Sequence, residues 1–196
     1  MPDITETVEI AKREQWRAWL AKHHHTKREI WLVADLRERG SGPSYLDVVE
    51  EALCFGWIDG LAKKFDDLRQ AQRFTPRRPN SNWTELNKER VRRLIREGLM
   101  TEAGLAVAPD LTLRPVEIAP DIARALEQRG AMAFFTACPE AYQRIRLGYV
   151  EEQRGNASAF TTRLSNLVKQ SAAGVMFGNW DDSELRRTPT SARKRS

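Results

Sequence analysis

The chain has 196 residues, of which 41% are hydrophobic and 30% charged, and its formal net charge is +5. This composition predicts a folded protein, because disordered chains are poorer in apolar residues, and the length predicts one domain or one domain with a small addition. We find no apolar run near the ~18 residues of a membrane helix and no export signal at the start. The two cysteines, Cys54 and Cys138, are too few for a disulfide framework. We therefore expect a cytoplasmic protein with reduced thiols.

The positive charge is concentrated in two segments. Residues 69–96 carry nine basic and two acidic residues, and residues 183–196 carry five basic residues and one acidic residue. A concentrated basic segment attracts anions through its local field. The last segment lacks apolar periodicity, so we expect a disordered basic tail over 179–196. The tail is interpreted as a solubilising segment. The alternative is that the basic segment and the tail make weak contacts with nucleic acid.

The N-terminal part of the chain predicts helices and strands in alternation. Apolar spacing predicts a helix from Val8 to His24, and the apolar run 29–36 predicts a strand. Ser44 and Asp47 have the spacing of a capping box, so a further helix begins there. We expect that helix to end near Gly56.

A hairpin and another helix follow. The strands are expected over 56–65 and 68–75, with Asp66 and Asp67 in the turn. Asn82 and Glu85 resemble a cap for the next helix, which ends near Gly98. The expected fold class is α+β: a small antiparallel sheet of about three strands, packed with helices and followed by a C-terminal helical module. The expected division is an α+β domain over 1–104, a proline-containing linker over 105–120, a helical module over 121–178 and the basic tail over 179–196.

Two motifs carry a family resemblance. They are EALCFGWIDG at 51–60 and QRFTPRRPNSNW at 72–83, the latter followed by RVRRLIREGLM at 90–100. Together they closely resemble the YdeI/OmpD-associated family, also called the bacteriocin-protection family, over residues 10–104. The resemblance implies a bacterial cytoplasmic protein connected with resistance and stress phenotypes. It implies no reaction.

The hairpin motif also predicts a ligand-binding site. On a strand, Trp57 and Asp59 share one face, and Arg73 and Thr75 share a face of the next strand. Arginine offers a planar fork of donors for phosphate or carboxylate, and tryptophan offers a stacking surface. The candidate ligand-binding residues are Trp57, Asp59, Gly60, Arg73, Thr75, Arg77, Arg78, Trp83 and Asn87. The competing structural interpretation is that Asp59 pairs with Arg73 and that both tryptophans belong to the core.

Other candidate groups favour structural roles. His23, His24 and His25 are consecutive, so their side chains on a helix point about 100° apart and cannot converge on one metal ion. Cys54 stands at the C-terminal end of a helix, where the dipole disfavours a thiolate. We therefore predict no metal site, no cofactor and no catalytic cysteine. Three functional hypotheses remain: a binding module for an anionic, phosphate- or nucleotide-like ligand, which we favour; a nucleic-acid binder; and an enzyme with Asp59 as acid or base.

Overall fold

The computed structural model describes residues 3–36, 41–78, 81–178 and 180. It is an α+β protein, as the sequence predicts, and its strands form one four-stranded sheet within the described residues. None of the helices described is long and apolar enough to cross a membrane. The chain divides into two compact units. The first holds the residues up to Asn82 together with Arg90–Leu111, and the second holds Trp83–Glu89 together with the residues from Thr112 onwards. Apart from Trp180, the predicted tail lies outside the described residues.

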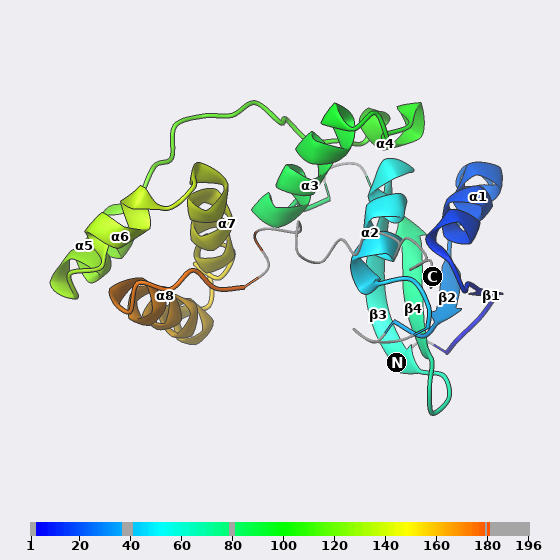
Figure 1. Cartoon of the computed structure of the whole chain (residues 1–196), viewed down its shortest axis with the longest axis horizontal. Helices are drawn as coiled ribbons and strands as arrows, with labels where there is room; N and C mark the ends of the chain where they lie inside the picture. The colour runs from blue at the N-terminus through cyan, green and yellow to red at the C-terminus, as the bar shows by residue number, and fades with distance from the viewer. Residues whose placement is uncertain (1–2, 37–40, 79–80, 179, 181–196) are drawn as a thin grey trace, which may run out of the picture. The chain divides into compact units, whose positions relative to one another are not determined.

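The first unit is built around the sheet. Its elements are β1 (Thr7–Glu9), α1 (Arg13–His23), β2 (Ile30–Ala34), α2 (Tyr45–Cys54), β3 (Trp57–Lys64), β4 (Gln70–Pro76), the last two turns of α3 (Glu85–Arg96) and α4 (Glu102–Ala106) (Figure 1). The strand order is β1-β2-β4-β3. β1 is parallel to β2, whereas the other two pairs are antiparallel. The sheet is therefore mixed, where a purely antiparallel one was expected.

The first strand corrects the predicted start of the first helix. Val8 was expected to begin that helix but lies in β1, and α1 begins only at Arg13. The backbone nitrogen of Trp31 donates to the Glu6 oxygen at 2.9 Å, and that of Ile10 donates to the Val33 oxygen at 3.0 Å. Pairing with the edge of β2 thus satisfies backbone groups that a helix would otherwise have used.

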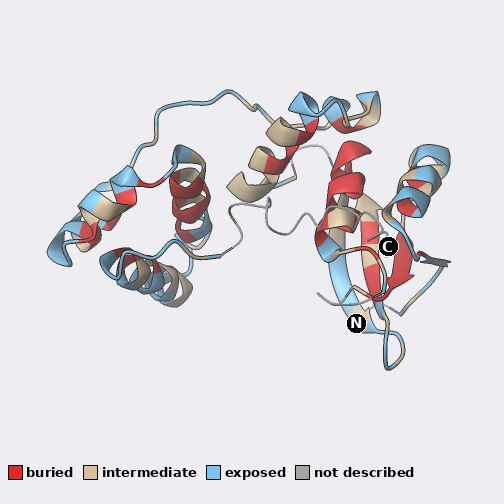
Figure 2. Ribbon diagram, viewed as in Figure 1, coloured by how far each residue is buried: buried red, intermediate tan, exposed pale blue. Residues whose placement is uncertain are grey.

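Both faces of the sheet are covered in the described structure. On one face the Trp16 ring of α1 packs against Phe74 with the centroids 5.2 Å apart, and its indole donates to the Val48 oxygen of α2 at 2.9 Å. On the opposite face Trp31 and Val33 form a cluster with Ala71. All five residues of β2 are consequently buried, as Figure 2 shows. Such continuous burial explains why β2 is an apolar run rather than an alternating pattern.

The second unit is helical, as expected. It contains α5 (Pro120–Gln128), α6 (Met132–Ala137), α7 (Glu140–Glu151) and α8 (Ala157–Ala172), and the segment from 108 to 119 forms neither helix nor strand. Its core is lined by Ile122, Leu126, Phe135, Tyr142 and Leu167, which are at most 1% exposed. Pro120 opens α5 at a position where its missing N–H costs nothing.

Two adjacent carboxylates are buried in α2 and are neutralised by arginines of two other helices. Glu50 and Glu51 are 1% and 2% exposed. Arg13 of α1 donates to Glu51 at 2.6 Å and to Glu50 at 3.0 Å, and Arg17 donates to Glu51 at 2.7 Å. Arg93 of α3 binds the other carboxylate oxygen of Glu50. We call these five residues the buried ion network.

The network holds its charges firmly. Burial alone would lower the pKa of Arg13, but the neighbouring Glu51, Glu50 and Asp47 carboxylates outweigh it and raise that pKa above its ordinary value. The guanidinium of Arg13 is therefore charged at neutral pH. Arg17 adds a bond from its other nitrogen to the Leu99 oxygen at 2.9 Å, so the network also holds the segment after α3.

Replacing Glu51 by alanine tests the network. We expect Glu51→Ala to lower the free energy of unfolding by about 3 kcal/mol, because it leaves Arg13 and Arg17 without their shared carboxylate. The loss is not larger because both arginines are partly exposed and can be solvated by water. Urea unfolding followed by circular dichroism measures this loss. The matched control is Glu14→Ala on the exposed surface of α1, expected to change stability by less than about 0.5 kcal/mol. Equal effects of the two substitutions would refute the role of the network.

The end of α2 also supports α4 through a very close approach. Both the Thr101 backbone nitrogen and its hydroxyl donate to the Cys54 oxygen, at 3.1 and 2.6 Å. A Cβ added to Gly104 would lie 2.2 Å from that same oxygen. Only glycine at this position lets the helix reach the carbonyl.

We therefore expect Gly104→Ala to destabilise the protein by about 1–3 kcal/mol through overpacking, although alanine is the better helix former. Gly155→Ala is the control, since a Cβ there meets nothing within 4 Å. Thermal unfolding of both variants makes the comparison. A neutral or stabilising Gly104→Ala would contradict the close approach.

Candidate functional site

Tyr45 and Asp59 meet at the start of α2 and β3. Ser44 caps α2, with its hydroxyl accepting from the Asp47 backbone nitrogen, and this capping box fixes Tyr45 as the first helical residue. The Tyr45 hydroxyl donates to the Asp59 carboxylate at 2.5 Å. Tyr45 is 44% exposed, but partial burial of its hydroxyl, together with this bond to a carboxylate, raises the pKa of Tyr45 above its ordinary value. The phenol is thus a fixed hydrogen-bond donor at neutral pH.

Arg77 follows β4 and lies beside the same carboxylate. Its backbone nitrogen donates to the Gly56 oxygen at 2.8 Å, and its guanidinium donates to the Asn82 oxygen at 3.3 Å. The residue is only 5% exposed, and this burial lowers the pKa of Arg77 to about 10, with the Asp59 charge acting in the opposite direction. Arg77 therefore carries a positive charge at neutral pH in a place that disfavours it.

Arg90 contributes a second buried cation. It is 8% exposed on α3, and its charge acts on the Tyr45 hydroxyl. We call Tyr45, Asp59, Arg77 and Arg90 the arginine–aspartate cluster. It brings together one carboxylate and two guanidinium groups, and a guanidinium is a planar set of donors that suits an oxyanion. Arg78, the next residue after Arg77, is exposed.

Trp57 belongs to the core, as the structural interpretation had it. It is 1% exposed, its indole donates to the His24 oxygen at 3.2 Å, and its ring meets the edge of Trp19 with the centroids 6.0 Å apart. Gly60 is exposed, and a Cβ there would meet only Arg73 atoms, at 3.8 Å or more. The Trp57 ring is therefore not exposed for stacking on a ligand. No backbone atom of the described chain approaches Gly60 so closely that a side chain would be excluded there.

Arg73 and Thr75 lie on the other face of the sheet from Asp59. The register pairs Asp59 with Phe74, and residues directly opposite each other share a face. The Arg73 guanidinium instead binds Glu29, with its Nε donating at 2.7 Å. The pairing of Asp59 with Arg73 in the competing structural interpretation is therefore wrong, because the strands are offset by one residue from the register that it requires.

Trp83 and Asn87 belong to the second unit. Asn87 lies in the first turn of α3, where its backbone nitrogen donates to the Thr84 hydroxyl at 3.2 Å. Their sharing of a ligand with Asp59 and the arginines stays a prediction. Tyr45 and Arg90, in turn, were missed from the sequence, since nothing in the local pattern links a residue after a helix cap to a strand fourteen positions later.

Most of the basic side chains described below for the segment 69–96 form ion pairs with other residues of this chain or are buried. Arg69 binds Asp66 and Glu9, each at 2.7 Å, and Lys88 binds Glu85 at 2.6 Å. Arg73 and Arg93 bind Glu29 and Glu50, while Arg77 and Arg90 are buried. Its high charge therefore reflects internal ion pairs more than a continuous basic surface.

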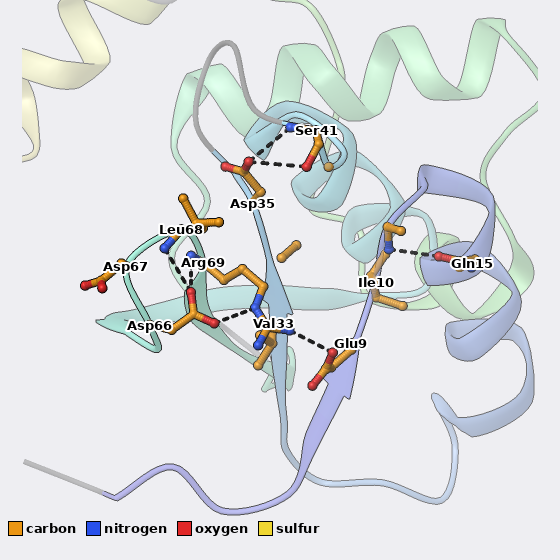
Figure 3. Close-up of a pocket in the computed structure, with 13 residues that line it drawn as sticks. Glu9, Ile10, Gln15, Val33, Asp35, Ser41, Asp66, Asp67, Leu68 and Arg69 are labelled. Carbon is orange, nitrogen blue, oxygen red and sulfur yellow. Dashed lines mark hydrogen bonds and ion pairs between the residues drawn. The ribbon is translucent and has the colours of Figure 1, made fainter.

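A cavity of about 550 Å³ lies at the other end of the hairpin (Figure 3). Its lining includes the carboxylates of Glu9, Asp35, Asp66 and Asp67, with Arg69 reaching between Glu9 and Asp66. The Asp35 carboxylate accepts from the Ser41 backbone nitrogen at 3.0 Å. An excess of carboxylates disfavours anions here, which separates this cavity chemically from the arginine–aspartate cluster.

The histidines show no convergence on a common centre. The His23 ring packs on Trp19 with the centroids 4.9 Å apart, and the His24 ring nitrogen Nδ1 lies 2.9 Å from the Leu20 oxygen. Within the described part of the chain, no three His, Cys, Asp or Glu side chains are grouped to hold a metal ion.

Comparison with known proteins places this chain in a family. A family model described as a domain of unknown function, DUF8412, matches residues 8–107, slightly more than half of the chain. The chain belongs to this family, and the match includes every residue of the arginine–aspartate cluster. No curated protein and no solved structure gave a match.

Both cysteines are buried. Burial, with a smaller contribution from the Glu51 charge, raises the pKa of Cys54 to about 11, and burial also raises the pKa of Cys138. At pH 8 only about one Cys54 in a thousand is then a thiolate, the reactive form.

We therefore expect neither thiol to react with 5,5′-dithiobis(2-nitrobenzoic acid) within minutes at pH 8 in the folded protein. Two thiols should react at once in 6 M guanidinium chloride, because unfolding restores ordinary pKa values and access. Absorbance at 412 nm counts them, and Cys138→Ser assigns the signal. A fast thiol that remains in native Cys138→Ser would show that Cys54 is activated.

Proposed function

We propose that this protein is a non-enzymatic binding module for a small anionic ligand, phosphate- or nucleotide-like, held at the arginine–aspartate cluster. The observation that carries the proposal is the placement of two buried arginines. Arg77 lies beside the Asp59 carboxylate, and the charge of Arg90 acts on the Tyr45 hydroxyl that binds this carboxylate. Guanidinium groups bind phosphate and carboxylate oxygens through charge-assisted hydrogen bonds, so an oxyanion is the ligand that their chemistry suits. The exposed Arg78, next to Arg77 in the chain, supplies further donors at the edge of the cluster.

The biological setting is part of the same proposal. The motifs at 51–60 and 72–83 resemble the YdeI/OmpD-associated family, so we place the protein in the bacterial cytoplasm, in a stress or antimicrobial-peptide and bacteriocin response. The internal pairing of Arg69, Arg73 and Arg93 gives less weight to a nucleic-acid function. Asp59 has a tyrosine donor and a neighbouring cation but no second carboxylate among these partners, so we do not favour a role as acid or base.

A thermal-shift series tests the proposal. Inorganic phosphate, pyrophosphate, adenine nucleotides, acidic metabolites and a short RNA are added to the full chain, since a ligand that binds the folded state raises the melting temperature. We expect pyrophosphate or a nucleotide to raise it. The exposed Arg78→Glu should weaken binding about 10-fold, whereas Asp59→Asn should strengthen it severalfold by removing the competing negative charge.

Arg28→Glu is the control, because it makes the same change of charge at an exposed position outside the cluster. It should leave the shift unchanged. Absence of any shift across the panel, or equal loss in Arg28→Glu and Arg78→Glu, would overturn the proposal. A shift with RNA alone, falling steeply with added salt, would favour the nucleic-acid alternative.

A further inference from the structure

A second concave site lies on the helical unit, outside the matched family region. It is a groove of about 550 Å³ between α5 and α8, which lie side by side in this unit. Its lining comprises Ala125, Gln128 and Arg129 at the end of α5, and Leu164, Ser165, Val168, Lys169 and Ala172 of α8. This volume falls within the usual range of small-molecule sites.

The charge of the groove has one sign. Arg129 and Lys169 come from different helices and are both exposed, and no carboxylate is among the lining residues. Neither cation forms an ion pair with any residue that the structure describes, in contrast to Arg154 of the same unit, which binds Asp121 at 2.9 Å. Two such cations facing one groove concentrate anions there.

The floor of the groove is apolar. Val168 is 8% exposed and belongs to the core of the unit, and Leu164 is half-buried against the same core. Alanines at 125 and 172 leave the space between the helices open, while the Gln128 and Ser165 side chains border it. An apolar group entering this space would release water at a gain of roughly 25 cal/mol per Å² of apolar surface covered.

We infer that the α5–α8 groove binds a small amphiphilic anion, with its apolar body on Leu164 and Val168 and its carboxylate, sulfonate or phosphate group between Arg129 and Lys169. Inorganic anions lack the apolar body, and neutral apolar molecules lack the charge, so each half of the ligand alone should bind weakly. This site differs in both chemistry and position in the sequence from the arginine–aspartate cluster.

The probe is 8-anilinonaphthalene-1-sulfonate, titrated into the full chain and followed by its fluorescence. We expect one saturable site from which decanoate, but not sulfate at equal concentration, displaces the probe. N-phenyl-1-naphthylamine has the same rings without the sulfonate, and it should bind at least about 10-fold more weakly if the two cations hold the charged group. Equal affinity for both molecules would overturn the inference.

Two variants locate the site. Arg129→Gln combined with Lys169→Gln should weaken sulfonate binding at least about 10-fold and leave the neutral probe unaffected, because only the charged contact is lost. Ser165→Trp should block both probes by filling the groove. The control pair, Arg124→Gln with Arg28→Gln, removes the same charge at exposed positions outside the lining. Unchanged affinity in the first pair, or an equal loss in the control pair, would show that the probe binds outside the groove and would overturn the inference. Arg78→Glu, at the arginine–aspartate cluster, should retain full binding of the sulfonate probe.

Discussion

The neighbouring carboxylates of Glu50 and Glu51 are the constraint on which the first unit depends. Two adjacent negative charges in an apolar helix face cost several kcal/mol each to desolvate unless cations meet them. Arg13 and Arg17 of α1 and Arg93 of α3 supply these cations. These ion pairs join α1 and α3 to α2. Tyr45, the first residue of α2, binds Asp59 of the sheet through its hydroxyl. The geometry of the arginine–aspartate cluster thus follows from ion pairs formed further along the same helix.

Local patterns predicted the elements whose signals are contained in a few residues. The capping box of Ser44 and Asp47 is present, and the Asp66 carboxylate accepts from two backbone nitrogens in the hairpin turn, as its sequence indicates. β1 was missed because three residues cannot establish a period, and because its pairing partner comes more than twenty residues later. Its existence is decided by the free edge of β2, which is a tertiary effect.

The sequence predicted which types of residue form the candidate site, but it predicted only part of their spatial arrangement. Alternation correctly indicates that Arg73 and Thr75 share a face, but it cannot say which residues of the neighbouring strand share that face with them. The register decides this, and the pairing of Asp59 with Phe74 sends Asp59 towards α2 and Arg73 towards Glu29. A shift of one residue would have reversed the outcome. Tyr45 was beyond reach for the same reason, since its partner is fixed by packing of α2 on the sheet.

The irregular pairing of β3 has a consequence for association between molecules. β3 is an edge strand, and its register with β4 shifts between Asp59 and Ala62. A long regular edge is a template to which another chain can add a strand, leading to aggregates. Such an interruption increases the local twist of a strand, and the exposed Lys64 adds charge to this edge three residues after the exposed Leu61. The hairpin can therefore extend an apolar side chain into solvent while its backbone remains a poor template for strand addition.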